Sequence, residues 1–314
     1  MKSGVLFPGQ GSQYVGMGQD LYDHFEVARQ TFQQADDALD FPLSQWIFEG
    51  PAARLEATEW QQPAILTVSV AAWRTFMERA LSFKVELGLG LSLGEYSAYV
   101  ASGVLDFADA VRLTRVRGQA MQTAVPAGAG GMMAVLGLAR DLVEELCLRA
   151  GGSGVVEPAN FNAPGQVVAA GINRGLDRLE ELVVEAKGRA VRLPVSAPFH
   201  SSLLAPAGEV LAEALAPLHL RDADFGVVAN VDSSICRVPD EIVPRLVQQV
   251  SKPVQFEAGV RVLMASGIEC LFEFGPGHSL ASLVKKIDRK LPVYSIENRD
   301  ELVKALELLE EAKL

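Results

Sequence analysis

The stretch GLGLSLGEYSAY, from Gly88 to Tyr99, places Ser92 between glycines and then takes up helical spacing. A Gly-x-Ser-x-Gly pattern between a buried strand and a helix is typical of a nucleophile elbow, a tight turn that lifts the serine hydroxyl clear of a sheet. The N-terminus of the following helix presents backbone N–H groups that can stabilise an oxyanion. The stretch therefore favours Ser92 as a nucleophile, with a glycine-lined turn around an inert serine as the alternative.

A serine nucleophile requires a base, and the chain offers four histidines for that role. His24 and His219 lie in amphipathic helical patterns, which indicates surface or packing roles. His278 follows a strand and two glycines in FGPGHSL, so it lies either near a cleft or in a structural position. His200 follows a predicted strand in LPVSAPFHSSLL, and it is the candidate general base.

The elements that must position these residues follow from the hydrophobic pattern. Short apolar runs alternate with longer amphipathic runs, which is typical of an α/β sheet with helices on its faces. The strand predicted at 83–90 runs directly into Ser92, and helical spacing begins at Gly94. Further strands are expected at 4–7, 225–231 and 270–277. Helices are expected at 19–39, 64–81, 203–218 and 299–314, and a further helix is expected to end near Gln249.

A second, smaller domain is predicted inside the first. The glycine-rich stretch VPAGAGG at 125–131 indicates a flexible connector, and the six predicted elements that follow have the order β-α-β-β-α-β, which is that of a ferredoxin-like unit. We therefore expect a large, α/β-hydrolase-like domain with a parallel-sheet core from 1–125 and 196–314, and an inserted ferredoxin-like domain from 126–195. The cleft between them is the natural place for a ligand.

Composition limits the classes of partner. The formal net charge of −11 argues against nucleic acid, whose phosphates require clustered Lys and Arg. The three cysteines are far apart and lack CxxC spacing, so neither a disulfide framework nor a metal site is expected. The apolar run near the N-terminus is too short for a signal peptide, and no 18-residue apolar stretch follows. We expect a cytoplasmic protein that does not contact a membrane.

Seven motifs together resemble one family. The chain is similar to the malonyl-CoA:acyl carrier protein transacylase family, whose motifs occur here in the family's order over nearly the whole length. They are LFPGQGSQYVGMG, GLSLGEYSAYVASG, RGQAMQ, NFNAPGQVVAAG, APFHSSL, VQQVSKPVQF and FEFGPGHSL.

The resemblance implies a ping-pong acyl transfer. Ser92 would attack the thioester of malonyl-CoA and carry the malonyl group as an ester, while His200 would serve as the proton acceptor and donor. By analogy with the family, a backbone carbonyl near Gln249 would orient His200, which makes a Ser-His dyad. The backbone N–H groups of Gln10 and Leu93 would form the oxyanion hole.

The resemblance also implies how the substrate is recognised. Arg117 would pair with the free carboxylate of the malonyl group through a guanidinium fork. Phe199 would crowd an α-methyl group, so malonyl is expected to be preferred over methylmalonyl. The other substrate-binding positions implied are Gln249, Leu91, Asn160 and Asn162. Leu91 departs from the His that the family often has before the nucleophile, and we expect catalysis to survive this change.

The implied partners are malonyl-CoA as donor and phosphopantetheinylated acyl carrier protein as acceptor, with no permanently bound cofactor and a monomeric enzyme serving fatty acid biosynthesis. Two alternatives stay open: a trans-acting acyltransferase of a polyketide or polyunsaturated-lipid synthase, and an acyl-thioester hydrolase. An acidic carrier would need a local positive patch. The candidates for it are Lys187, Arg189, Lys285, Lys286, Arg289 and Lys290.

Overall fold

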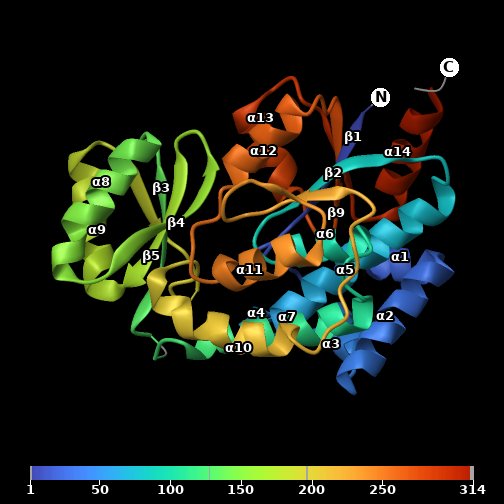
Figure 1. The fold of residues 1–314 in the computed structure, drawn as a ribbon, viewed down its shortest axis with the longest axis horizontal. Coiled ribbons are helices and arrows are strands. Elements are labelled where there is room, and N and C mark those ends of the chain that lie inside the picture. Colours follow the sequence, from blue (N-terminus) through green and yellow to red (C-terminus); the bar gives the residue numbers. More distant parts are fainter. Residues whose placement is uncertain (1, 127, 196, 312–314) are drawn as a thin grey trace.

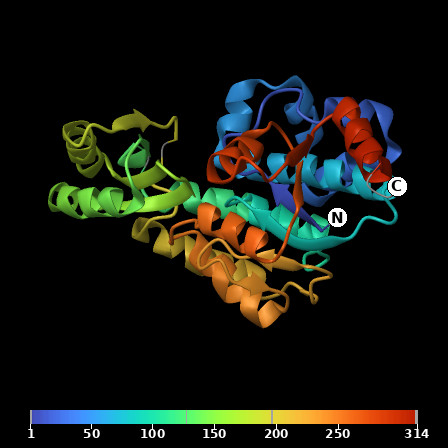
Figure 2. The same ribbon diagram turned by 90° about the horizontal axis from the view of Figure 1, so that it is seen from above.

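The structure is a computed structural model that describes residues 2–126, 128–195 and 197–311. Figure 1 shows two bodies of unequal size, and the turned view of Figure 2 shows the smaller one again at one end of the long axis. The smaller body consists of the green segments in the middle of the chain. The N-terminal and C-terminal parts of the chain therefore build the larger body together.

The larger body contains a six-stranded sheet with the order β10-β9-β1-β2-β7-β8. All neighbouring pairs from β10 to β7 are parallel, and only β8 at the edge pairs antiparallel. The α/β class with a parallel-sheet core is therefore confirmed. The strands are β1 (Ser3–Phe7), β2 (Val85–Gly90), β7 (Gly226–Val228), β8 (Ile235–Cys236), β9 (Cys270–Phe274) and β10 (Val293–Ile296).

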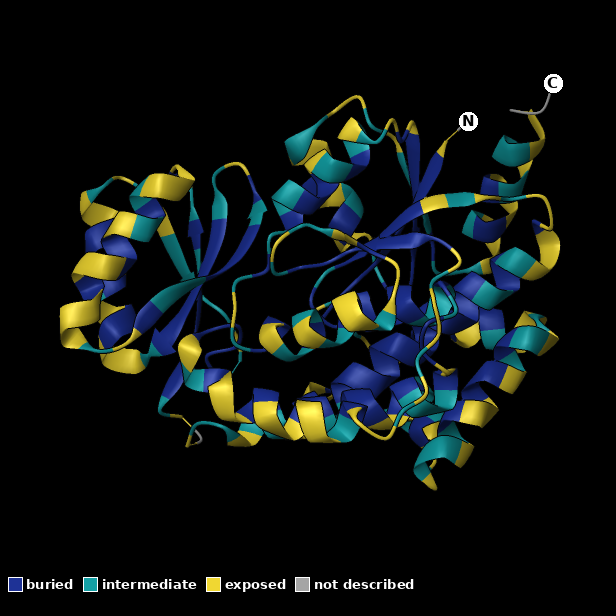
Figure 3. Ribbon diagram, viewed as in Figure 1, coloured by how far each residue is buried: buried dark blue, intermediate teal, exposed yellow. Residues whose placement is uncertain are grey.

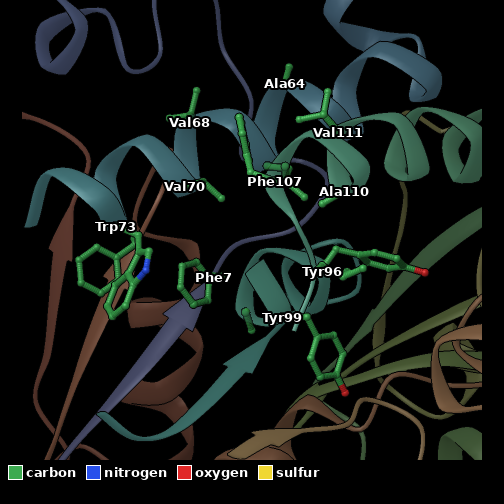
Figure 4. Close-up of a cluster of buried hydrophobic side chains, with 14 of the residues drawn as sticks. Phe7, Ala64, Val68, Val70, Trp73, Tyr96, Tyr99, Phe107, Ala110 and Val111 are labelled. Carbon is green, nitrogen blue, oxygen red and sulfur yellow. The ribbon is translucent and has the colours of Figure 1, made fainter. Parts of the chain in front are cut away.

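Alternation along the strands supplies both faces of this sheet with apolar side chains. Val5 and Phe7 belong to the core on one face, whereas Leu6 between them belongs to the core on the other face. Figure 4 shows Phe7 beside Trp73 of α5 (Thr58–Arg79), with ring centroids 6.4 Å apart. Strands β1, β7 and β9 of the sheet are wholly buried, and exposed residues concentrate on the outer sides of the helices (Figure 3).

Helices cover both faces of the large sheet. The core that includes Phe7 draws on α2, α5, α6, α7, α10 and α11, and the core that includes Leu6 draws on α12 and α13. Besides α5, the helical segments of this body are α1 (Gln19–His24), α2 (Glu26–Leu39), α3 (Leu43–Glu49), α4 (Ala52–Glu56), α6 (Gly94–Ala101), α7 (Phe107–Thr123), the short 3-10 turn η2 (Ser202–Leu204), α10 (Ala205–Leu215), α11 (Pro239–Gln249), α12 (Phe256–Ala265), α13 (Ser279–Ile287) and α14 (Arg299–Glu311).

The smaller body is a four-stranded antiparallel sheet, order β4-β5-β3-β6, packed against two helices. The element order and the antiparallel sheet are consistent with the predicted ferredoxin-like unit. We propose 126–195 as its domain limits; the predicted return at Ser196 lies outside the described residues. The elements are β3 (Gly130–Leu136), α8 (Arg140–Ala150), the 3-10 turn η1 (Gly151–Ser153), β4 (Val156–Ala163), β5 (Gln166–Ile172), α9 (Asn173–Glu185) and β6 (Arg189–Arg192).

One strand of the smaller body also pairs with the larger body. Asn160 of β4 forms an isolated parallel bridge with Val254, which precedes α12. The N–H of Phe161 donates to Val254 O over 2.8 Å, and the N–H of Val254 donates to Ala159 O over 2.8 Å. This pairing holds the end of β4, with Asn160 and Asn162, against the edge of the larger body.

Three local predictions were wrong in their boundaries. The helix predicted at 19–39 is broken at Phe25, which is extended (φ −131°) and whose ring lies under the Arg79 guanidinium at 4.3 Å. The helix predicted to begin after Pro63 begins at Thr58 and contains Pro63, because residues 61–73 are all buried and their packing outweighs the lost hydrogen bond. His219 lies beyond the end of α10, since Pro217 follows that helix.

No helix in the described part of the chain is both long and apolar enough to cross a membrane.

Candidate active site

The predicted elbow is present between β2 and α6. Ser92 has a φ of 53°, a left-handed backbone that is rare for a residue with a side chain and is typical of a strained functional turn. A Cβ added to Gly94 would lie 2.0 Å from the backbone oxygen of Phe7, so only glycine fits against β1. The glycine after the serine is therefore required by the close approach of helix and strand.

The elbow brings Ser92 to His200. Ser92 Oγ lies 2.7 Å from His200 Nε2, and His200 Nδ1 lies 2.7 Å from the backbone oxygen of Gln249. Because a carbonyl oxygen can only accept, Nδ1 carries the hydrogen and Nε2 presents its lone pair to the serine hydroxyl. His200 also has a left-handed backbone, with a φ of 60°. The geometry is that of a Ser-His pair oriented by a backbone carbonyl.

His200 is a neutral base in this environment. Burial, and secondly the positive charge of Arg117, lower the pKa of His200 to about 3. In the described part of the chain no carboxylate contacts the imidazole ring. The ring is therefore free to take a proton from Ser92 at neutral pH.

Arg117 on α7 is buried at 1 % exposure rather than lying on the helix surface. Its Nη1 donates to Gln62 Oε1 over 2.6 Å, and its Nη2 donates to Gln249 Oε1 over 2.8 Å and to Ser92 Oγ over 3.1 Å. Among the described residues, no carboxylate lies within ion-pair distance of this guanidinium. A buried cation with only neutral acceptors beside the nucleophile is suited to an anionic substrate group.

Asn230, which the sequence reasoning missed, holds the elbow in place. Its Oδ1 accepts from the N–H of Ser92 over 2.7 Å, and its Nδ2 donates to Gly90 O over 2.7 Å. Asn230 follows β7, the strand next to β2. A polar residue at the carboxyl end of a buried parallel strand is a signal that could have found it.

Glu95 and Gln62 were also missed. Gln62 lies in the part of α5 that was predicted to be outside the helix, so its contact with Arg117 was not foreseeable from the pattern. Glu95 is the residue after the Gly-x-Ser-x-Gly pattern, and its carboxylate accepts from Gln249 Nε2 over 2.6 Å. Burial raises the pKa of Glu95 to about 7.

A cavity of about 160 Å³ opens in front of the serine. The predicted site residues line it except Leu93, Arg117 and Gln249. Asn162 Oδ1 is buried there without a hydrogen-bond partner. The lining residues are Gln10, Leu91, Ser92, Met121, Met132, Asn160, Asn162, Val168, Leu193, Val195, Phe199 and His200, drawn from both bodies.

The loop PGQG lies against the elbow. A Cβ added to Gly9 would lie 2.2 Å from the backbone oxygen of Leu91, so the two loops touch through their backbones. Gln10 therefore borders the cavity near Ser92, and Leu93 directly precedes α6. Within the described ranges, the backbone N–H groups of Gln10 and Leu93 donate no hydrogen bond to the protein. Both are available for an oxyanion.

The other histidines do not line this cavity. His278 is half-exposed, and its Nε2 lies 3.5 Å from Glu297 Oε1 and 3.4 Å from Glu301 Oε1. His24 contacts Asp20 on α1. The position of His278 thus favours a structural role over a role near the cleft.

Comparison with known proteins agrees with this geometry. The family model described as acyl transferase domain matches residues 5–296. A malonyl CoA-acyl carrier protein transacylase of Bacillus subtilis is 41 % identical over 99 % of this chain and 98 % of its own length. The crystal structure of a malonyl CoA-acyl carrier protein transacylase from Clostridium perfringens has a TM-score of 0.96 and 40 % identity, covering 100 % of this chain and 98 % of that one.

A second solved structure is a malonyl-transacylase in complex with its type II PKS acyl-carrier protein. It has a TM-score of 0.96 and 39 % identity, and the match covers 98 % of this chain and 100 % of that chain. The likeness in sequence and in fold thus extends over nearly the full length of each relative. The chain belongs to the malonyl CoA-acyl carrier protein transacylase family, and it is an acyltransferase.

Proposed function

We propose that the protein transfers the malonyl group from malonyl-CoA to the phosphopantetheine thiol of acyl carrier protein, and so supplies fatty acid biosynthesis. One observation carries the proposal. Ser92 Oγ lies 2.7 Å from His200 Nε2 and 3.1 Å from Arg117 Nη2. The nucleophile thus lies within one hydrogen bond both of its base and of a cation that can bind a carboxylate.

In the first step, Ser92 Oγ attacks the thioester carbon of malonyl-CoA while His200 Nε2 takes the hydroxyl proton. The backbone N–H groups of Gln10 and Leu93 stabilise the oxyanion of the tetrahedral intermediate. The C–S bond then breaks, the CoA thiolate takes the proton from His200, and a seryl-malonyl ester remains.

In the second step, the thiol of the carrier's phosphopantetheine arm takes the place of CoA. His200 removes the thiol proton, and the thiolate attacks the ester carbon. The C–O bond breaks, and the departing Ser92 oxygen takes the proton back from His200. The enzyme is thereby restored, and each malonyl group has passed through one covalent intermediate.

Specificity rests on the far end of the acyl group. Arg117 pairs with the malonyl carboxylate, which an acetyl group lacks. The ring of Phe199, buried at 4 % exposure in the cavity wall, crowds an α-methyl group. Gln249, Leu91, Asn160 and Asn162 bind the remaining parts of the substrate. Leu91 contributes an apolar wall in place of a polar contact.

The carrier-bound relative supports acyl carrier protein as the acceptor. Within the basic patch proposed for docking, Lys286 donates to Gln166 Oε1 of β5 over 2.6 Å, so this end of the patch spans both bodies. The protein acts in the cytoplasm as a monomer and uses malonyl-CoA as a substrate without a permanently bound cofactor.

Intact-protein mass spectrometry after mixing with malonyl-CoA or acetyl-CoA tests the proposal. A malonyl adduct is expected on the wild type, and it should disappear when phosphopantetheinylated carrier is added. Ser92→Ala should abolish the adduct, whereas Ser97→Ala should retain it, because Ser97 is a buried serine of the following helix α6 whose hydroxyl has no hydrogen-bond partner among the described residues. Steady release of malonate without carrier would instead indicate a hydrolase.

A further inference from the structure

Glu95 is a buried carboxylate that the proposed mechanism does not use. It lies in the first turn of α6 at 0 % exposure. Its Oε2 accepts from Gln249 Nε2 over 2.6 Å and from the N–H of Asn230 over 3.1 Å, and its Oε1 accepts from the Tyr99 hydroxyl over 3.3 Å. All these partners are donors without a positive charge, so Glu95 is not part of an ion pair.

The most consequential of these partners is the side-chain amide of Gln249. Its Nε2 donates to Glu95 Oε2 and to the backbone oxygen of Ser92 over 2.9 Å, while its Oε1 accepts from Arg117 Nη2. An amide has one donating and one accepting end, and the two can exchange by a flip about the last side-chain bond. A flipped amide would oppose the Arg117 N–H groups with its own N–H groups.

The two acceptors on that side, Glu95 Oε2 and the backbone oxygen of Ser92, therefore select the amide orientation that Arg117 requires, and Glu95 makes the shorter of the two hydrogen bonds. We propose that Glu95 is a positioning residue that fixes the amide of Gln249, and through it holds the Arg117 guanidinium at the place where an acyl carboxylate binds. The part of this proposal that concerns the carboxylate rests on the proposed function. The part that concerns Gln249 and Arg117 rests on the hydrogen bonds alone.

The selection does not depend on the charge of Glu95. Protonation can occur at Oε1, where the Tyr99 oxygen can serve as acceptor, and Oε2 still accepts from Gln249. A glutamine at this position can act in the same way, with its Oε1 facing Gln249 and its Nε2 facing Tyr99. The side chain at position 95 thus needs a hydrogen-bond acceptor of the same shape facing Gln249, but it does not need a negative charge.

The test compares Glu95→Met, which keeps the length of the side chain without a strong acceptor, with Glu95→Gln. Single-turnover acylation of Ser92 is followed by intact-protein mass spectrometry with malonyl-CoA and acetyl-CoA. In Glu95→Met the ratio of the malonyl rate to the acetyl rate should fall about 10- to 100-fold, the loss expected for a hydrogen bond to a charged group. Glu95→Gln should recover most of this ratio.

The matched control is Glu273→Met. Glu273 is a second carboxylate at 0 % exposure, and it accepts from the N–H groups of Leu280 and Ala281 at the start of α13, outside the site. This variant should lose stability without a change in the malonyl-to-acetyl ratio. An equal fall of the ratio in Glu95→Gln and Glu95→Met, or an unchanged ratio in Glu95→Met, would overturn the proposal.

A crystal structure of Glu95→Met provides a readout that needs no substrate. We expect Arg117 Nη2 to lie out of hydrogen-bond reach of the Gln249 amide in the variant and within reach in the wild type. An unmoved Arg117 would refute the positioning role. If the wild type formed no malonyl adduct, the proposed function would fail, and this structure would still decide the role of Glu95.

Discussion

Replacement of Arg117 by alanine should convert a malonyl-selective enzyme into one that acylates Ser92 about equally fast from malonyl-CoA and acetyl-CoA. The guanidinium is buried, and its Nη2 lies within hydrogen-bond distance of the nucleophile. A malonyl carboxylate bound there gains two charge-assisted hydrogen bonds in a site with little water. An acetyl group has nothing to place against the cation.

The size of the effect follows from the partners that Arg117 already has. Breaking a buried ion pair by removing one member typically costs about 3 to 5 kcal/mol. In the free enzyme, however, Gln62 and Gln249 each accept a hydrogen bond from the guanidinium, so part of its desolvation is already offset. We therefore expect the lower end, about 3 kcal/mol, which is about 150-fold in the malonyl-to-acetyl rate ratio.

Quenched-flow mixing followed by intact-protein mass spectrometry measures both acylation rates on the same enzyme. Arg112→Ala is the matched control, because Arg112 lies on the same helix with its side chain 54 % exposed and paired with Asp109. That variant should keep the wild-type ratio. A wild-type ratio in Arg117→Ala would refute the assignment of Arg117 to the carboxylate.

Three further outcomes are expected. The pKa of His200 is about 3 in the folded protein and about 6.5 in the unfolded chain, so below pH 6.5 the unfolded chain binds a proton that the folded protein does not. Relative to His200→Gln, the wild-type free energy of unfolding, measured in urea, should therefore fall by about 1.4 kcal/mol per pH unit below pH 6.5, which amounts to about 2 kcal/mol at pH 5. If the unfolding free energies of wild type and variant changed in parallel with pH, the pKa shift of His200 would be contradicted. Gly94→Ala should destabilise the fold by at least about 2 kcal/mol, because the new Cβ meets the Phe7 backbone oxygen at 2.0 Å, and an unchanged urea midpoint would exclude the close approach. Phe199→Ala should raise the methylmalonyl-to-malonyl rate ratio by about tenfold, measured by competition between the two CoA esters, and comparable turnover of both by the wild type would already refute the steric argument.

Much of the fold was predictable because the relevant signals are local. The strand ending at Gly90, the helix beginning at Gly94 and the series β3-α8-β4-β5-α9-β6 follow from apolar periodicity and turn residues. Boundaries were predicted less well where packing outweighs local preference. Pro63 lies inside α5 and Phe25 divides a helix, since burial of neighbouring side chains contributes more free energy than a single backbone hydrogen bond.

The sequence by itself determined which residues are available for chemistry: one elbow serine, four histidines, and a set of motifs whose order resembles one family. Only the tertiary structure decided which of them meet. Asn230 lies 138 residues from Ser92 in the chain and Gln249 lies 157 residues away, yet both hydrogen-bond to its backbone. Such contacts depend on strand order and helix packing, which no local pattern encodes. The same packing buries Arg117 on a helix whose neighbouring arginine, Arg112, is exposed, and so gives two identical side chains different chemistry.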